Sequence, residues 1–253
     1  MEKSKMKKMK WFENWFDSKY YQILYKNRNQ EEAKLLIDNL INKFKPNKYS
    51  CFLDLCCGNG RHATYLNKQG FKVDGVDLSD KSLNIARKNK NQNLNFYCED
   101  MREYVKNNKY DFILNLFTSF GYFETKQDNL RVIKNSCKSL KINGYFIIDF
   151  FNSEIIKKNI IEKEIKIIND IIFKINKSYD KEFIYKQIEI NDKGSKYTFT
   201  EKVRLLNKSS FIDLSKGLNL RLEETFGDYY LNPFNELNSD RLIIVFKKIN
   251  NYE

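Results

Sequence analysis

Length, composition and charge exclude several classes of protein. The chain has 253 residues, 42% of them hydrophobic, so it can bury a core and is not a disordered tail. Its 45 lysines and arginines outnumber 33 acidic residues, but the two kinds are interspersed, as on a solvated surface. No apolar run reaches the roughly 18 residues of a spanning helix, and residues 1–10 carry five lysines without an apolar segment. We therefore expect a cytoplasmic protein without a membrane partner.

The cysteines indicate reduced thiols. They are odd in number, form no CxxC pair and lie mostly in apolar runs, where a thiol behaves as a small hydrophobic group. We expect neither disulfides nor a bound metal. The cysteines are Cys51, Cys56, Cys57, Cys98 and Cys137.

The first half of the chain predicts alternating helices and strands. Glu31 to Lys45 places apolar residues at helical spacing, and Pro46 ends this helix. Short apolar runs then alternate with helical stretches, which is typical of a parallel, doubly wound α/β sheet. The expected strands are Cys51–Cys56, Phe71–Val76, Leu94–Cys98, Tyr110–Leu116 and Tyr145–Phe151.

The second half predicts an antiparallel insertion followed by two closing strands. Alternating apolar and polar residues predict three inserted strands. The closing pair brings the main sheet to seven strands, so the insertion follows the fifth strand. The inserted strands are Ile165–Asn176, Phe183–Asn191 and Lys196–Leu206, and the closing ones are Leu218–Phe226 and Leu242–Lys248.

A glycine-rich turn joins the first strand to the next helix. The sequence Gly58-x-Gly60-x-x-Ala63 lets a ligand approach backbone amides at a helix N-terminus, although this motif alone does not identify a cofactor. Asp54 lies at the strand end, four residues before Gly58, where a carboxylate suits the amino group of a cofactor. These residues predict a nucleoside-cofactor site.

Polar residues also follow the next three strands. Asp77 ends the second strand, 17 residues after Gly60, and can accept hydrogen bonds from ribose hydroxyls. Glu99-Asp100-Met101 ends the third strand, where an acid can pair with an adenine amine, and the fourth strand ends at Asn115-Leu-Phe-Thr. Four neighbouring strand exits therefore carry groups suited to one bound cofactor.

These four segments resemble the successive motifs of the class I S-adenosylmethionine-dependent methyltransferases. The resemblance covers residues 30–152, and Cys-Cys-Gly-Asn-Gly-Arg-His resembles a Cys-Gly-x-Gly-Arg-His subgroup. It implies S-adenosylmethionine as cofactor and a Rossmann-like, mostly parallel seven-stranded sheet with an antiparallel insertion. The implied division is an aromatic N-terminal lid or helix, a cofactor-binding core, a β-rich insertion covering the acceptor site, and the closing strands. The respective ranges are 1–30, 31–152, 153–217 and 218–253.

The same resemblance assigns residues to parts of the cofactor. One residue departs from the family pattern, because Cys56 replaces the first glycine and narrows the approach to the cofactor. The implied contacts are Asp54, Gly58 and Gly60 with the methionine part, Asp77 with the ribose beside Leu78, Asp100 and Met101 with the adenine, and Asn115 and Phe117 with the methyl-donor pocket.

The N-terminal segment from Trp11 to Arg28 is dense in aromatic residues and supports two interpretations. It could fold over the cofactor as a lid, offering Tyr20, Tyr21 or Tyr25 to the sulfonium and Arg28 to a carboxylate. It could instead be an amphipathic helix whose aromatic side chains pack on the sheet edge.

Catalytic residues are not evident from the sequence. His62 is the single histidine and a candidate general base, and Tyr21 is a second candidate. Methyl transfer from a sulfonium is an in-line displacement with an activated donor, so alignment of the two ligands supplies most of the effect. A missing base is therefore compatible with activity.

The acceptor is expected to be a small molecule methylated at nitrogen or oxygen. The fourth strand lacks the Asn/Asp-Pro-Pro-Tyr/Phe sequence of many base-modifying enzymes and has Asn115-Leu-Phe-Thr instead. An RNA methyltransferase, favoured by the charge of +12, and a non-catalytic cofactor-binding protein remain alternatives. A nicotinamide-dependent oxidoreductase would leave Asp54 and Asp100 unexplained. Either a monomer or a homodimer is expected.

Overall fold

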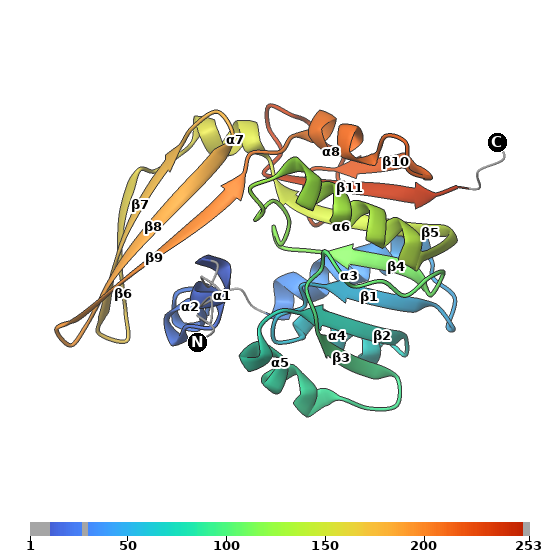
Figure 1. Cartoon of the computed structure of the whole chain (residues 1–253), viewed down its shortest axis with the longest axis horizontal. Coiled ribbons are helices and arrows are strands. Elements are labelled where there is room, and N and C mark those ends of the chain that lie inside the picture. Colours follow the sequence, from blue (N-terminus) through green and yellow to red (C-terminus); the bar gives the residue numbers. More distant parts are fainter. Residues whose placement is uncertain (1–10, 27–29, 250–253) are drawn as a thin grey trace, which may run out of the picture.

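The computed structural model describes residues 11–26 and 30–249, which form two sheets with their helices (Figure 1). The larger sheet has seven strands in the order β10-β11-β5-β4-β1-β2-β3. Five neighbouring strands are parallel, and β11 runs antiparallel to both β5 and β10. The strands are β1 Cys51–Leu55, β2 Lys72–Asp77, β3 Leu94–Cys98, β4 Tyr110–Asn115, β5 Leu140–Phe151, β10 Leu220–Phe226 and β11 Arg241–Lys248. The predicted mostly parallel, doubly wound sheet is confirmed.

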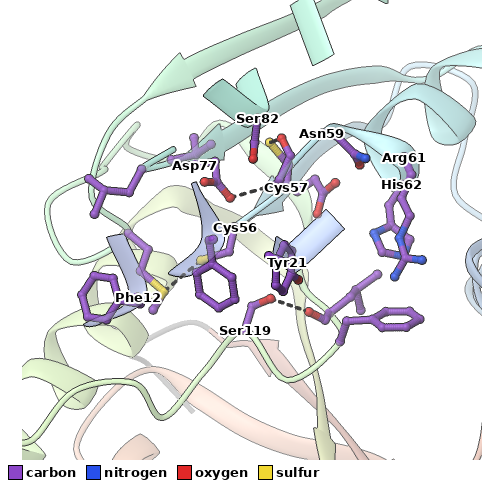
Figure 2. A pocket seen from close by; sticks show the side chains of 18 of the residues that line it. Phe12, Tyr21, Cys56, Cys57, Asn59, Arg61, His62, Asp77, Ser82 and Ser119 are labelled. Carbon is purple, nitrogen blue, oxygen red and sulfur yellow. Dashed lines mark hydrogen bonds between the residues drawn. The ribbon is translucent and has the colours of Figure 1, made fainter. Parts of the chain in front are cut away.

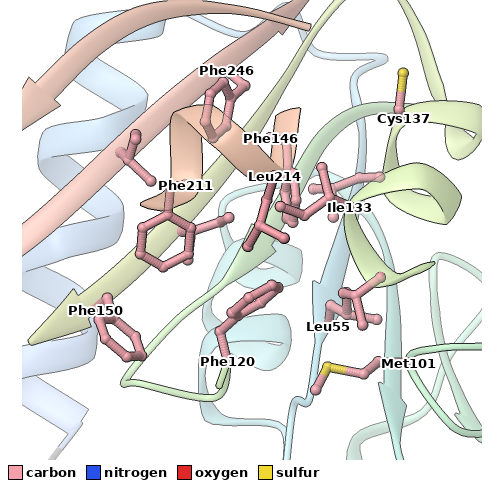
Figure 3. Packing of buried hydrophobic residues seen from close by; sticks show 14 of the residues in the cluster. Leu55, Met101, Phe120, Ile133, Cys137, Phe146, Phe150, Phe211, Leu214 and Phe246 are labelled. Atoms are coloured by element: carbon pink, nitrogen blue, oxygen red, sulfur yellow. The ribbon is translucent and has the colours of Figure 1, made fainter. Parts of the chain in front are cut away.

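Helices cover both faces of this sheet because both faces of its strands are apolar. Residues of α3, α4 and α5 join one buried cluster, and residues of α6 and α8 join the other, which includes Phe120, Phe146 and Phe211 (Figure 3). The helices are α3 Gln30–Phe44, α4 Arg61–Lys68, α5 Asp80–Ala86 with the short η1 Arg87–Asn89, α6 Lys126–Ser139 and α8 Lys208–Ser215. None of the helices in the described ranges is both long and apolar enough to cross a membrane.

The insertion forms a separate antiparallel sheet of four strands, preceded by α7 Ser153–Lys158. One predicted strand was wrong: Ile165–Asn176 is two strands joined by a tight turn at Asn169 and Asp170. Both turn residues have a left-handed φ, 51° and 61°, which asparagine and aspartate tolerate and which matches the twist of a hairpin. The strands are β6 Lys163–Ile168, β7 Ile171–Tyr179, β8 Phe183–Asp192 and β9 Ser195–Arg204.

Two short N-terminal helices, α1 Trp11–Phe16 and α2 Lys19–Leu24, lie between the insertion sheet and the main sheet (Figure 1). Trp15 is fully buried against the insertion sheet, and its indole N–H donates to Glu201 at 2.7 Å. On the other side, the hydroxyl of Ser79 donates to Asp17. The helix pair therefore connects the insertion to the cofactor-binding half.

The burial of Trp15 leads to a prediction about how stably α1 and α2 are docked on the insertion sheet. Trp15→Ala removes a buried ring and leaves a cavity, which costs about 3–5 kcal/mol where the site cannot collapse. We expect α1 and α2 to lose hydrogen-exchange protection while β1 to β5 keep theirs. As a control, Tyr179→Ala removes an exposed ring from the same sheet and should leave both unchanged. Equal loss of protection in both regions would show that the helix pair is part of the global folding unit.

Candidate active site

A pocket of about 420 Å³ opens at the carboxyl ends of the parallel strands, beneath α1 and α2 (Figure 2). Its lining combines strand-end residues of the main sheet with aromatic residues of the helix pair. This is the position at which open α/β sheets bind ligands. The lining residues include Asp54, Cys56, Gly58, Asn59, Arg61, His62, Asp77, Leu78, Ser82, Glu99, Asp100, Met101, Phe117, Ser119, Phe12, Phe16, Tyr21 and Tyr25.

The glycine turn is held open by Asp77. One carboxylate oxygen of Asp77 accepts the N–H of Gly58 at 2.8 Å, and the other accepts the N–H of Ser79 at 2.8 Å. Gly58 has a φ of 53°, and no atom lies within 4 Å of the place where a Cβ would stand. The backbone of the turn is therefore directly accessible from the pocket, as the sequence predicted. Burial raises the pKa of Asp77, and the backbone N–H donors oppose this rise.

Asp54 is a buried carboxylate within the pocket wall. Its side chain is 1% exposed and accepts the N–H of Ala63, in the first turn of α4, at 3.1 Å. Burial raises the pKa of Asp54 to about 7, although the Ala63 N–H and the Arg61 charge favour its ionised form. In the described part of the chain, no lysine or arginine forms an ion pair with Asp54. Its negative charge is thus available to a positively charged ligand.

Cys56 adopts a left-handed backbone conformation, with a φ of 67°, at the position where the family pattern has glycine. For a residue with a Cβ this conformation costs roughly 1–2 kcal/mol. Its sulfur lies 3.3 Å from the sulfur of Met101, and burial raises the pKa of the thiol well above its usual range. The Cys56 side chain therefore occupies the pocket wall beside the expected adenine site, as a neutral thiol.

Asp100 lines the pocket next to Met101, and its carboxylate forms an ion pair with Arg102. The Arg102 guanidinium binds both carboxylate oxygens, with distances of 2.5 to 3.1 Å, and also reaches Asp128 at 3.2 Å. The backbone N–H of Arg102 also donates to Oδ1 of Asp100, at 2.9 Å. The arginine fixes the orientation of the acid expected to meet the adenine.

Two predicted cofactor residues lie behind the pocket instead of lining it. Gly60 packs on the core, since a Cβ there would lie 2.9 Å from atoms of Ala86 and Phe96. Its φ of 77° also requires glycine, so the reason for this glycine is packing. Asn115 is fully buried, and its amide donates to the carbonyl of Leu55 at 3.0 Å, which joins β4 to β1.

The N-terminal helices direct aromatic side chains both to the pocket and to the insertion sheet. Phe12, Tyr21 and Tyr25 line the pocket from above, whereas Tyr20 points to the insertion sheet and donates to Asp192 at 2.9 Å. Tyr20 is therefore not brought to the pocket, and Arg28 lies outside the described residues. Among the described residues, the insertion contributes nothing to the lining. It supports the helix pair that does.

His62 lies in the pocket wall but is poorly suited to act as a base. Its ring is 5% exposed and stands 5.4 Å from the ring of Phe117, and its Nε2 has no hydrogen-bond partner in the described structure. Burial, together with the charge of Arg61, lowers the pKa of His62 to about 3. A base with this pKa binds a proton only weakly at neutral pH, which disfavours general-base catalysis.

Sequence reasoning missed several lining residues. The guanidinium of Arg61 lies 3.9 Å above the centre of the Phe117 ring, and Ser119 donates to the carbonyl of Leu116 at 2.7 Å. Phe12 and Phe16 are four residues apart, so helical spacing would have placed them on one face. The residues after Phe117 lie in an irregular loop, so the sequence has no periodic pattern that would predict where their side chains point.

The comparisons with known proteins agree with this geometry. Residues 52–144 match a family described as a methyltransferase domain. A sugar N,N-dimethyltransferase from Streptomyces venezuelae, dTDP-3-amino-3,4,6-trideoxy-alpha-D-glucopyranose N,N-dimethyltransferase, is 25% identical over 131 residues, which are 51% of this chain and 54% of the relative. A ubiquinone biosynthesis O-methyltransferase from Coxiella burnetii is 31% identical over 104 residues, 40% of this chain and 43% of the relative. The chain thus spans about half the length of these curated relatives.

A solved structure shares the whole fold. The crystal structure of an S-adenosylmethionine-dependent methyltransferase from Clostridium acetobutylicum has a TM-score of 0.77 at 17% identity, covering 91% of this chain and 96% of that chain. The sheet order and the strand-end pocket thus define a Rossmann-like domain. Residues 52–144 within it are similar to a methyltransferase domain, and the fold is similar to that of an S-adenosylmethionine-dependent methyltransferase.

The buried charge of Asp54 predicts a pH-dependent stability. The pKa of about 7 exceeds the ordinary 3.8, so between these pH values the folded state binds a proton that the unfolded state has lost. Stability therefore falls as pH rises across this window. Asp54→Asn removes the charge and keeps an acceptor for the Ala63 N–H. Above pH 7 we expect this variant to be more stable, by at most on the order of 4 kcal/mol.

Urea unfolding of the wild type and Asp54→Asn across this pH range measures the difference. The advantage of the variant should shrink to nearly zero toward about pH 3, where the wild-type carboxyl is largely protonated in both states. A difference that stays constant with pH would rule out a titrating Asp54.

Proposed function

We propose that this chain transfers the methyl group of S-adenosylmethionine to a nitrogen or oxygen of a small-molecule acceptor. One observation carries the proposal: a single pocket joins carboxylates at the ends of β1, β2 and β3, of which Asp54 is buried, to an aromatic wall from α1 and α2. The carboxylates suit the cationic cofactor, and the aromatic wall suits a compact organic acceptor and the sulfonium charge.

The side chains present fit the cofactor. Asp54 offers an unpaired negative charge to the α-ammonium group, and the open Gly58 backbone leaves room for the methionine part. Asp77 retains lone pairs for the ribose hydroxyls after accepting its two backbone N–H groups. Asp100 and Met101 line the place proposed for the adenine. All five of these residues line the pocket.

The chemistry that the cofactor supplies when bound is an activated methyl group on a sulfonium. The chain therefore has to align the two ligands and exclude water, which the helix pair over the pocket does. His62 stays neutral, so its ring and that of Phe117 act as uncharged walls. The acceptor atom must then already carry a free lone pair, as an amine or an ionised hydroxyl does.

The aromatic part of the pocket is the proposed acceptor site. Phe12, Phe16 and Tyr21 belong to the helix pair, and Tyr122 and Phe123 come from the loop after β4. Arg61 and the exposed Lys26 also line the pocket, which favours an acceptor that carries a negative group elsewhere in the molecule. The similarity to an amino-sugar N-methyltransferase and to an O-methyltransferase supports a small-molecule acceptor.

Substitution of Asp77 tests the proposed cofactor binding directly. Calorimetric titration of the wild type with S-adenosylmethionine should give a Kd in about the micromolar range, and no binding of a nicotinamide dinucleotide. Asp77→Ala removes the ribose acceptor and the support of the Gly58 turn, so its affinity should fall at least about a hundredfold. Asp80→Ala, an exposed acid at the start of α5, is the matched control and should bind normally. Dinucleotide binding instead would refute the proposal.

The raised pKa of Asp54 leads us to predict that the protein releases a proton when the cofactor binds. Because its pKa is about 7 in the ligand-free protein, the carboxyl is largely protonated at about pH 6 and must ionise to pair with an ammonium group. Affinity should therefore rise with pH up to about 7 and then level off. Calorimetry in two buffers of different ionisation enthalpy should show release of nearly one proton at about pH 6 and almost none at about pH 8.5. Asp54→Asn should show neither effect, and release by that variant would assign the proton elsewhere.

Acceptor screening separates small-molecule transfer from its alternatives. Turnover with amine or hydroxyl acceptors in a methyl-transfer assay supports the proposal. Salt-sensitive binding of RNA together with RNA methylation would replace it. Cofactor binding without turnover on either class would favour a non-catalytic role.

A further inference from the structure

Two consecutive residues after β4 hold an unusual backbone conformation. Phe117 and Thr118 have φ values of 60° and 59°, in the left-handed region. A bulky aromatic and a β-branched residue rarely adopt this conformation, because the Cβ then meets the backbone. Such a conformation persists only where surrounding groups hold it, so the neighbouring hydrogen bonds must compensate for the strain.

Asp149 supplies most of these bonds. It lies in β5 and is fully buried, and its carboxylate accepts the N–H of Phe117 at 2.8 Å. Its own carbonyl accepts the next N–H, that of Thr118, at 2.9 Å. Because Ile148 pairs with Asn115, the last residue of β4, Asp149 stands beside the point where the chain leaves the sheet. A single residue thus binds both strained backbone amides.

Two further side chains fix the Asp149 carboxylate. Arg241 at the start of β11 binds one oxygen through Nε at 2.8 Å and through Nη2 at 2.7 Å, and the same Nη2 donates to the Thr118 hydroxyl at 3.1 Å. The Tyr229 hydroxyl donates to the other oxygen at 3.1 Å. Burial of these charges is tolerated because each is paired and hydrogen-bonded. The network joins β5, β11 and the loop before β11 to the strained segment.

Phe117 of the strained segment lines the pocket, whereas Asp149 does not. The Phe117 ring lies among Arg61, whose guanidinium is 3.9 Å away, the His62 ring at 5.4 Å and the Tyr229 ring at 5.7 Å. It therefore stands between residues of the glycine-turn helix and the closing strands. A change at Asp149 would reach the pocket through Phe117, the lining residue whose N–H it binds.

We propose that Asp149 is a positioning residue that holds Phe117 as the wall of the pocket at the methyl-donor end. Arg241 and Tyr229 orient Asp149 for this task. The proposal rests on the proposed function for its catalytic meaning, but the conformational part concerns the ligand-free protein. Without Asp149, the segment relaxes toward ordinary backbone conformations, and the Phe117 ring leaves its single position.

The first experiment measures this position without any ligand. A fluorinated phenylalanine is placed at residue 117, and fluorine NMR is recorded for the wild type, Asp149→Asn and Tyr229→Phe. Asp149→Asn should broaden or split the single resonance, and Tyr229→Phe, which removes one hydrogen bond to the same carboxylate, should do so more weakly. Asp74→Asn is the matched control: Asp74 is also a buried acid on a parallel strand, bound to Lys109 and Tyr110, and does not line the pocket. Its spectrum should match the wild type.

The second experiment measures the consequence for the site. S-adenosylmethionine and S-adenosylhomocysteine are titrated into the same variants. Far-ultraviolet circular dichroism spectra equal to that of the wild type show beforehand that each variant is folded. A displaced wall should weaken both about tenfold in Asp149→Asn, with little change in Asp74→Asn. Thr118→Asn added to Asp149→Asn should recover part of the affinity, because asparagine adopts the left-handed conformation more easily than threonine.

The outcomes separate this proposal from the proposed function. A sharp, unshifted fluorine resonance in Asp149→Asn would overturn the positioning role, whatever the cofactor does. A resonance that is sharp in the wild type and broadened in Asp149→Asn, in proteins that bind no cofactor, would keep the positioning role and refute the function. If Asp149→Asn does not fold, the Tyr229→Phe variant tests the positioning role instead. A fluorine spectrum and a cofactor affinity of Tyr229→Phe equal to those of the wild type would contradict the proposed network.

Discussion

Desolvation of two carboxylates, Asp54 and Asp77, is the physical constraint on which the site depends. Both lie at the ends of adjacent parallel strands, where burial disfavours their charge. Backbone N–H groups compensate: those of Gly58 and Ala63 come from the sharp turn of β1 into α4, and that of Ser79 comes from the start of α5. This turn needs left-handed conformations, so the glycine pattern, the helix start and the acids form one unit. A cationic ligand lowers the remaining electrostatic cost, which couples binding to the ionisation of Asp54.

The cover of the pocket depends on contacts between distant parts of the chain. Glu201 accepts hydrogen bonds from Trp15 and from Tyr25, at 2.7 and 2.6 Å, and so ties both N-terminal helices to β9. At its end, β9 binds the loop after β4, where the N–H of Arg204 donates to the carbonyl of Gly121 at 2.8 Å. The insertion therefore supports two walls of the pocket without lining it, and changes in the insertion can act on acceptor binding at a distance.

The sequence predicted elements whose signals are local. Apolar runs located β1 to β5 to within a few residues, although β5 begins earlier than expected, at Leu140, and Asp54, Asp77 and Asp100 follow from strand-end motifs. It could not predict the direction of Tyr20, because the rotation of a short helix is set by its docking on residues more than 170 positions away. The role of Asp149 was also missed, although an acid within the apolar run from Tyr145 to Phe151 is a signal of a buried polar network.

The uncharged rings of His62 and Phe117 limit the kind of acceptor that the proposed reaction can use. A histidine with a pKa of about 3 neither removes a proton from a bound amine at neutral pH nor repels the sulfonium. The adjacent positive charge of Arg61 lies over the Phe117 ring, which offers its negative π face to that cation. His62 and Phe117 thus present uncharged rings to a ligand on this side of the pocket, with the positive charge of Arg61 beside them. In the proposed reaction no side chain there removes a proton, so the acceptor has to arrive with its lone pair free, as a deprotonated amine or an ionised hydroxyl, and this disfavours unactivated alcohols.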